Sequence, residues 1–314
     1  MTTPTKSFSR FIGCDVGKAS VVVFDSLTGL LATIANRPKD LASFAASLDA
    51  ECLVVCEATG GYEAALLHAT VVADVPAHRA DARKVKAFIR SFGTLGKTDA
   101  IDARALARYG AERQTILARW QAPEPGRKDL QAMVLTRADL MAERVAYSNR
   151  LAAPGAAIVR GCINKLLTCI NAQIKALDAA IAALIRAHQP LALAAKALRT
   201  IKGIGPQTTA ALVALMPELG TLDRKQAAAL AGLAPHPKQS GGHDGYRRVK
   251  GGRPEVKRVL FMAALVAVRY NQTLRGFYNR LLADGKKKLV AIVAVMRKMI
   301  VIANARLRDA LAVA

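Results

Sequence analysis

The stretch RFIGCDVGKASVVVFD occupies residues 10–25 and predicts two β-strands, at residues 10–15 and 19–25, joined by a turn. A second stretch, CLVVC at residues 52–56, is short and wholly apolar, which is typical of a strand buried inside a sheet. Glu57 follows this stretch directly, and a Thr-Gly-Gly sequence then interrupts it. The N-terminal region is therefore predicted to fold around a β-sheet.

Strands and helices alternate in the residues that flank these two stretches. Further strands are predicted at residues 30–36 and 73–78, and helices at 38–48, 62–70, 84–91 and 98–112. Because strands are followed by alternating strands and helices, the predicted fold class is α/β with a mixed sheet. The turn PEPG closes this predicted domain, which spans residues 1–126.

The remainder of the chain is predicted to be mainly α-helical. Residues 127–190 hold apolar positions at nearly heptad spacing, interrupted at Pro154-Gly155, which predicts a helical hairpin or a coiled coil. This spacer would serve either for dimerisation or as an internal strut. Residues 191–314 form the predicted third domain, with two Gly-rich breaks, KGIG at 202–205 and SGGHDGYRRVKGG at 240–252.

Positive charge is concentrated in the second half of the chain. The net charge is +23, and residues 151–314 contribute +19 of it, from 26 Lys and Arg against 7 Asp and Glu. An excess of this size attracts polyanions, of which nucleic acid is the commonest. A basic protein kept soluble by its charge is the alternative.

The composition also bears on compartment and on metal chemistry. No uninterrupted apolar run reaches the ~18 residues of a membrane-spanning helix, and the first residues lack the apolar core of a signal peptide. We therefore expect a cytoplasmic protein. The five cysteines are odd in number and include no CxxC pair, which argues against a disulfide framework and a zinc site.

Four acidic residues stand where a metal site would need them. Asp15 lies in the first predicted strand and Glu57 at the end of a buried one. Asp99 and Asp102 are three residues apart, so both project from one face of a predicted helix. Clustered carboxylates repel one another unless cations neutralise them, and Mg²⁺ prefers such oxygen ligands. Two such ions roughly 4 Å apart can activate an attacking oxygen and stabilise a leaving one in phosphoryl transfer.

Each acid also has an ordinary structural explanation. Asp15 could be a turn residue, Glu57 could cap the next helix, and Asp99 could favour a helix N-terminus. The joint pattern, rather than any single residue, supports a metal site. Its order along strands and helix is the one that ribonuclease-H-like nucleases, including Holliday-junction resolvases, would present.

Six blocks of the sequence resemble those of a known family. The blocks are GCDVGKAS around Asp15, VVCEATGGYE around Glu57, KTDAIDARALARYG around Asp99 and Asp102, LRTIKGIGPQTTAALVA, LAGLAPHPKQSGG and KGGRPEVKRVLFMAALVA. In this order they resemble the insertion-sequence-110 transposases, also called DEDD transposases, which are similar to Piv-type DNA invertases. The resemblance covers nearly the whole chain.

The resemblance implies both a fold and a chemistry. It implies a ribonuclease-H-like (RuvC-like) domain, a helical coiled-coil spacer and a C-terminal transposase domain with Ser240 as its nucleophile. The implied Mg²⁺ ligands are Asp15, Glu57, Asp99 and Asp102. Such proteins are guided by a structured bridge RNA that pairs with target and donor DNA. They act as dimers joined into tetramers, with each active site completed by domains from different subunits.

Physical reasoning gives Ser240 weaker support of its own. It begins a Gly-rich loop whose backbone can approach a phosphate closely. The basic residues that follow it, and that could stabilise charge on phosphorus, are Arg247, Arg248, Lys250 and Arg253. A covalent phosphoserine would conserve the bond energy needed for rejoining DNA. No neighbouring general base is evident: metal-bound carboxylates, Asp244 or His243 could assist. An ordinary Ser-Gly turn is the alternative.

The sequence IKGIG at residues 201–205 resembles the hairpin of helix-hairpin-helix modules. In such a hairpin, backbone N–H groups bind a phosphate without reading sequence, which assigns Lys202, Gly203 and Gly205 to nucleic-acid binding. A plain turn between two helices is the alternative.

Three functions compete on this evidence. The first is an RNA-guided transposase or recombinase that cuts and rejoins double-stranded DNA through a serine-linked intermediate. The second is a structure-specific endonuclease of the Holliday-junction-resolvase type that uses only the carboxylates. The third is a non-catalytic RNA-binding protein, and the complete set of four carboxylates argues against it.

Overall fold

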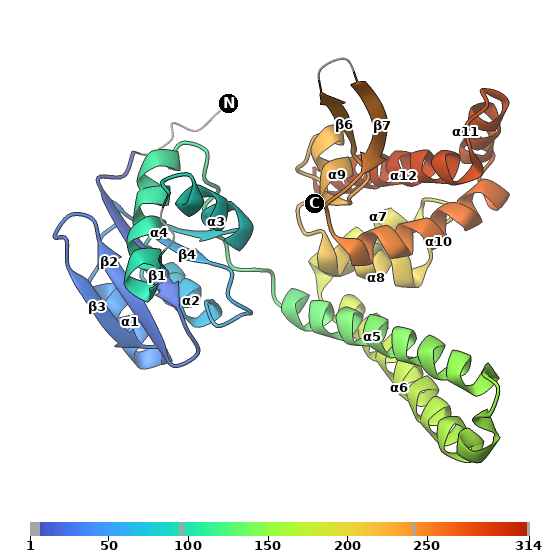
Figure 1. Ribbon diagram of the computed structural model, residues 1–314, viewed down its shortest axis with the longest axis horizontal. Helices are drawn as coiled ribbons and strands as arrows, with labels where there is room; N and C mark the ends of the chain where they lie inside the picture. Colours follow the sequence, from blue (N-terminus) through green and yellow to red (C-terminus); the bar gives the residue numbers. More distant parts are fainter. Residues whose placement is uncertain (1–6, 94–95, 97, 241–242, 313–314) are drawn as a thin grey trace. The chain divides into compact units, whose positions relative to one another are not determined.

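The computed structural model describes residues 7–93, 96, 98–240 and 243–312, and for residues 238–240, 243, 244 and 246 it describes the backbone alone. The chain forms two compact units, Met1–Pro123 and Glu124–Ala314. The first unit is α/β and the second is mainly helical (Figure 1). The predicted spacer, residues 127–190, and the predicted third domain, residues 191–314, both fall within the second unit.

A five-stranded mixed sheet forms the centre of the first unit. Its strand order is β3-β2-β1-β4-β5, with β1 antiparallel to β2 and parallel to β4. The strands are β1 (Arg10–Val16), β2 (Ser20–Asp25), β3 (Leu31–Ala35), β4 (Cys52–Glu57) and β5 (Ala77–Ala80). The predicted mixed sheet and its first four strands are therefore confirmed.

The fifth strand begins later than the predicted 73–78. Residues up to Val72 remain helical, because Ala69 and Thr70 are buried on that helix face. The chain then turns at Asp74, whose φ is +53°, and the strand Ala77–Ala80 pairs with β4. The prediction was wrong in its boundaries, since a run of apolar residues does not distinguish a helix end from a strand.

Two pairs of helices cover the two faces of the sheet (Figure 1). The helices are α1 (Pro38–Ala46) and α2 (Ala64–Val72) on one face, and α3 (Ala82–Arg90) and α4 (Asp99–Arg113) on the other. Successive strand residues point to opposite faces. Cys14 and Cys56 accordingly pack towards α1 and α2, whereas Phe11 and Val55 pack towards α3 and α4. Odd-numbered residues of β1 and β4 thus face α4.

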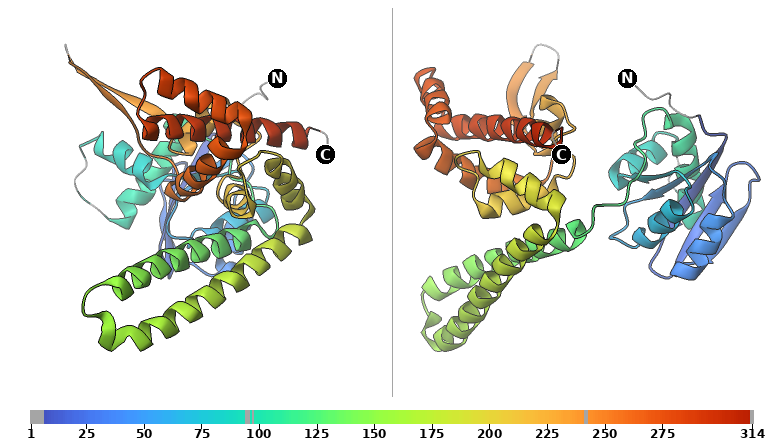
Figure 2. Two further views of the ribbon diagram at one scale, coloured as in Figure 1. Left: turned by 90° about the vertical axis from the view of Figure 1, so that its right-hand side faces the viewer. Right: turned by 180° about the vertical axis from the view of Figure 1, so that it is seen from behind.

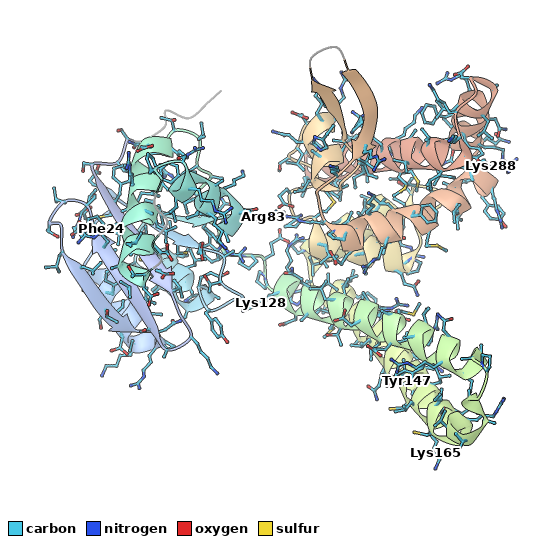
Figure 3. The ribbon with its side chains drawn as sticks, viewed as in Figure 1. Phe24, Arg83, Lys128, Tyr147, Lys165 and Lys288 are labelled. Carbon is cyan, nitrogen blue, oxygen red and sulfur yellow. The ribbon has the colours of Figure 1, made fainter. Side chains whose placement is uncertain are left out.

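Two long helices of the second unit, α5 (Arg127–Ala152) and α6 (Arg160–Ala187), lie side by side as a hairpin (Figure 2). The short helix η1 (Ala156–Val159) joins them, and Gly155, with φ of +83°, makes the predicted bend. Tyr147 on α5 and Lys165 on α6 are labelled in Figure 3. The helical hairpin is confirmed, whereas coiled-coil packing stays a prediction.

The stretch Ala156–Ala187 is, within the described part of the chain, the one helix long and apolar enough by composition to cross a membrane. Its apolar character is not evident as an unbroken run in the sequence, because Lys175 and Asp178 interrupt its apolar residues. Asp178 accepts a hydrogen bond from Arg137 of α5 at 2.6 Å. One such helix is weak evidence for a membrane span, and this one pairs with a charged helix instead.

The rest of the second unit packs around α8, which is buried from Thr208 to Leu215. The helices are α7 (Gln189–Arg199), α8 (Pro206–Leu215), α9 (Arg224–Leu230), α10 (Pro254–Tyr270), α11 (Gln272–Ala283) and α12 (Lys288–Leu311). The mainly helical prediction is confirmed, with one addition. Part of the predicted Gly-rich break at 240–252, together with the residues just before it, forms two antiparallel strands, β6 (Pro235–Ser240) and β7 (His243–Val249). Their sequence lacks the apolar alternation that marks a strand packed on a core.

Candidate active site

Asp15 and Glu57 lie next to one another on adjacent parallel strands. The register of β1 and β4 pairs Cys14 with Cys56, so the next residues along the two strands are Asp15 and Glu57. Neighbouring strands are about 4.8 Å apart, and residues in register point to the same face. Both carboxylates are half-buried on the face that α4 covers. The structure thus brings these two predicted residues together.

Helix α4 crosses this face in a register that two glycines set. A Cβ atom on Gly110 would lie 2.8 Å from Val55 Cγ2 and 3.3 Å from the Phe11 ring, so only glycine fits. Gly13 of β1 lies directly beneath Ala103, because a Cβ atom there would overlap the Ala103 carbonyl oxygen. A Cβ atom on Gly13 would also lie 2.5 Å from the Ala107 nitrogen, so Gly13 faces the turn between Ala103 and Ala107. As β1 advances from Phe11 to Gly13, α4 therefore runs back from Gly110 to this turn, and the two elements are antiparallel.

This register carries the first turn of α4 over Asp15. A strand rises about 3.3 Å per residue and a helix about 1.5 Å, so two residues of β1 match roughly four of α4. Two residues beyond Gly13, Asp15 faces the turn that holds Asp99 and Asp102. Thr98 begins the helix, and its hydroxyl accepts a hydrogen bond from the Ile101 N–H at 3.2 Å. This register thus places the first turn of α4, with Asp99 and Asp102, towards the end of the sheet that holds Asp15 and Glu57, and the grouping of all four carboxylates in one site stays a prediction.

The donor set fits a divalent cation, since carboxylate oxygens are hard ligands. Among the residues that the structure describes, no three His, Cys, Asp or Glu side chains lie close enough to hold one ion. Residues 94, 95 and 97, which precede α4, are outside the described residues. The four acids are therefore candidate ligands, but the described residues do not bring three of them close enough to bind the same ion.

A fifth acid, Glu63, orders the loop that follows Glu57, and the sequence analysis did not single it out. Its side chain is 3% exposed and accepts hydrogen bonds from the backbone N–H groups of Thr59 at 3.1 Å and Gly61 at 2.9 Å. It also forms an ion pair with Arg79 of β5 at 2.7 Å. An acid four residues after Thr59, in the Gly-rich turn that follows the strand, was the available signal.

The pKa of Glu63 reports the strength of these contacts. Burial acts to raise this pKa, but backbone hydrogen bonds and Arg79 outweigh burial and hold the pKa below its usual value. Burial also raises the pKa of the Cys56 thiol to about 12, and the charge of Glu63 adds to the shift. Cys56 therefore stays a neutral packing residue.

Ser240 is the last residue of β6, where its backbone pairs with that of His243. The prediction that Ser240 begins a loop was wrong, because the strands extend to both of these residues. Residues 241 and 242, and the side chains of Ser240, His243 and Asp244, lie outside what the structure describes. The general base therefore stays undetermined.

The base of this hairpin is tightly held. Gly232 and Gly252, both with φ of +70°, pack backbone against backbone, since a Cβ atom on either would overlap the other segment. Arg253 binds both carboxylate oxygens of Glu218, at 2.6 and 2.7 Å, and donates to the Leu215 carbonyl. Burial acts to raise the pKa of Glu218, but its hydrogen bonds and the charge of Arg253 together outweigh burial, so the pKa lies below its usual value. Arg253 thus has an intramolecular role, and its contact with nucleic acid stays a prediction.

The other predicted nucleic-acid residues are at the surface. Arg247, Arg248 and Lys250 are exposed on β7 and just beyond it. Residues 201–205 form the predicted turn between α7 and α8, with Lys202 and Gly205 exposed. Gly203 has a φ of +109°, and a Cβ atom there would lie 2.7 Å from Ala267 Cβ. The turn between helices is confirmed, whereas phosphate binding by its backbone stays a prediction.

The four carboxylates belong to the first unit and Ser240 to the second. Their meeting in one active site stays a prediction.

Comparison with known proteins gives consistent matches along the chain. Residues 12–154 match the family described as Transposase, of the DEDD type found in IS110, and residues 195–279 match the Transposase IS116/IS110/IS902 family. The pilin gene-inverting protein of Moraxella lacunata is 30% identical over 82% of this chain and 80% of its own length. Its counterpart from Moraxella bovis is 31% identical over the same shares.

An insertion-element protein matches a shorter region. The uncharacterized 43.6 kDa protein of insertion element IS110 from Streptomyces coelicolor is 31% identical over 62% of this chain and 51% of its own length. The DEDD match implies a ribonuclease-H-like fold for the first unit and divalent-metal dependence, and the mixed sheet agrees with that fold.

Proposed function

The chain belongs to the IS110 family of transposases, enzymes that cut and rejoin DNA, and from this premise we propose how its residues divide the reaction. Asp15, Glu57, Asp99 and Asp102 hold Mg²⁺, with two ions per site, and Ser240 is the nucleophile. The observation that supports the proposal is the antiparallel seating of α4 on β1, which turns the first turn of α4 towards the end of the sheet where Asp15 and Glu57 are neighbours.

In this proposal the residues of the chain have separate tasks. The bound ions lower the cost of negative charge on phosphorus. The Ser240 oxygen forms a bond to phosphorus as the bond from phosphorus to a sugar oxygen of DNA breaks, and the sugar hydroxyl leaves. The serine proton passes to a base that is not yet identified. Rejoining reverses these steps with another DNA end, so no external energy source is needed.

The second unit supplies the attraction for nucleic acid. Arg247, Arg248 and Lys250 on the exposed hairpin contact phosphates beside Ser240, and the turn at Lys202–Gly205 binds backbone phosphates. A bridge RNA pairs with donor and target DNA, so base pairing, rather than a helix of this protein, selects the sequence. The chain works in the bacterial cytoplasm as a dimer that assembles into a tetramer, with the α5–α6 hairpin as a dimerisation element.

Two variants test this division of tasks. Asp102→Asn should abolish Mg²⁺-dependent DNA cleavage, while Ser240→Ala should abolish both strand exchange and the covalent protein–DNA species seen on denaturing gels. If Ser240→Ala still cleaves DNA at the parental rate, the chain is a carboxylate nuclease of the resolvase type. If Asp102→Asn retains full cleavage, the carboxylate site is not catalytic.

The bridge RNA is tested separately. RNA crosslinked to the protein in cells and then sequenced should match a non-coding region that flanks the gene and pairs with the element's ends and its insertion site. Recovery of RNA without any defined sequence would contradict guidance, whatever the two variants show.

A further inference from the structure

A cavity of about 760 Å³ lies within the second unit, among α5, α6, α7, α8 and α10. Its volume falls in the range of roughly 300–1,000 Å³ that is common for small-ligand sites. Its walls are mostly aliphatic, and they include the buried side chains of Val134, Ile181 and Leu215. None of the residues discussed for cleavage lines this cavity.

Cationic side chains surround the cavity. Arg186 of α6, Lys196 and Arg199 of α7, and Arg258 of α10 line it, and all four are exposed. Within the described part of the chain, none of these four forms an ion pair. Of the two acids in the lining, Asp178 is already paired with Arg137, which leaves Glu255. The cavity therefore attracts an anion.

Backbone and hydroxyl groups add polar contacts to the aliphatic walls. The first turn of α8, at Pro206 and Gln207, lines the cavity, and its N-cap residue Gly205 supplies no side-chain cap. Uncapped N–H groups at a helix N-terminus favour negative charge. Thr209 also lines the cavity, is 2% exposed, and has a buried hydroxyl without a hydrogen-bond partner among the described residues.

We propose that this cavity binds one unpaired nucleotide of a nucleic-acid strand, with its base against the aliphatic walls and its phosphate at Lys196, Arg199 and Arg258. The flat base of a nucleotide suits the aliphatic walls, and its negative phosphate suits the cationic side chains around them. A second copy of the chain matches less well, because its second unit carries 31 Lys and Arg against 11 Asp and Glu and offers few negative groups to the cationic side chains around the cavity. Aliphatic walls accept any base, so the cavity holds a strand without reading its sequence.

Binding of short single strands by the full-length protein tests this proposal. Fluorescence anisotropy in EDTA keeps the measurement independent of the carboxylate site and of Ser240. The probes are an oligothymidylate, an oligouridylate of the same length, and an abasic strand with the same number of phosphates. Ala182→Trp fills the cavity from α6, and Ala172→Trp, on the same helix but outside the cavity, is the matched control.

Ala182→Trp should weaken binding of the base-bearing strands about fivefold or more, by analogy with the loss of one base contact, and leave the abasic strand unchanged. Ala172→Trp should change neither. The probe that loses more affinity, DNA or RNA, identifies the strand that the cavity prefers, and equal losses mean that it accepts both. Equal weakening of the abasic strand, or no weakening at all, would overturn the proposal.

A second variant carries the test if Ala182→Trp lowers the unfolding midpoint. Lys196→Ala combined with Arg199→Ala should reduce the slope of log affinity against log salt by about 0.7, because the neutralisation of one phosphate is lost. An unchanged slope would overturn the proposal. So would a change in oligomeric state, measured by sedimentation, with single-strand affinity unaltered, since the cavity would then be an interface between copies.

Discussion

The two units of this chain differ in the balance of their charged residues and in how those residues are paired. The first unit, residues 1–123, holds 15 Lys and Arg against 12 Asp and Glu, whereas the second, residues 124–314, holds 31 against 11. In the first unit, acids are fixed by cations, as in Arg10–Asp25 and Arg79–Glu63. In the second, most cations face solvent. The first unit holds its own negative groups in position, and the second attracts a negative partner.

The units also differ in how closely their elements approach. In the first, the backbone of α4 rests directly on Gly13. In the second, the α5–α6 hairpin leaves large apolar residues in solvent, with Val145 53% and Ile158 93% exposed. Substitutions that add volume should therefore be costly in the first unit and tolerated in that hairpin.

The largest expected effect comes from adding side-chain atoms at Gly13. Gly13→Val should destabilise the first unit by about 3 kcal/mol, since the backbone of α4 must move away from the sheet. Urea unfolding, followed by a probe in the first unit, measures the loss. An unchanged midpoint would show that α4 does not rest on β1, and the argument for the grouped carboxylates would fail with it.

The next effect concerns the loop after Glu57. Glu63→Ala should cost about 2–3 kcal/mol, because it removes two backbone hydrogen bonds and leaves Arg79 without its partner. The control is Glu112→Ala, whose ion pair with Arg108 is exposed and should contribute less than about 0.5 kcal/mol. Equal losses in the two variants would mean that Glu63 does not order the loop.

The stabilities of the two units should also respond differently to acid. In Asp25, burial acts to raise the pKa, but hydrogen bonds from Arg10, Leu27 and Thr28 lower it, and Glu63 is shifted in the same direction. A lowered pKa in the folded state stabilises the protein above the ordinary value of about 4, and this contribution is lost as the pH falls through the lowered value.

The unfolding midpoint of the first unit should thus stay level from neutral pH to about 5 and fall below about 4. In Asp25→Asn the midpoint should start lower and fall less steeply. A midpoint in the parent that is independent of pH down to 2 would contradict the paired-carboxylate description. The second unit, in which Glu218 is the acid with a lowered pKa among the described residues, should depend less on pH.

The smallest effect has the opposite sign. Gly161 lies near the start of α6, is exposed, and has no atom within 4 Å of the position a Cβ would take. Gly161→Ala should therefore stabilise the second unit by about 0.5 kcal/mol, since alanine favours the helix more than glycine does. A loss of stability on thermal unfolding would show that the hairpin is more crowded than described.

The sequence predicted the elements whose physics is local. Strands β1 and β4 follow from alternation and from an unbroken apolar run, and the bend at Gly155 follows from its Pro-Gly sequence. The grouping of Asp15 with Glu57 depends on a parallel pairing between segments forty residues apart, which periodicity does not reveal; the resemblance supplied it. The β6–β7 hairpin escaped prediction because its sequence has no apolar alternation, and those of its side chains that the structure describes are exposed or half-buried.

Glu63 was missed for a different reason. In the sequence, Glu63 cannot be distinguished from any other charged residue in a Gly-rich turn. Its burial depends on Arg79 of the neighbouring strand, and the sequence does not reveal this pairing. Arg253 shows the converse: its place in a basic run predicted a nucleic-acid contact, but Glu218, thirty-five residues earlier, binds it.

The start of α4 has one more consequence. Peptide dipoles along a helix add up to roughly half a positive charge at its first turn. Asp99 and Asp102 sit within that turn of a 15-residue helix that Thr98 caps. The helix itself therefore offsets part of the repulsion among the gathered carboxylates. In the proposed site, a bound cation would therefore have less repulsion to neutralise than the four carboxylates alone would produce.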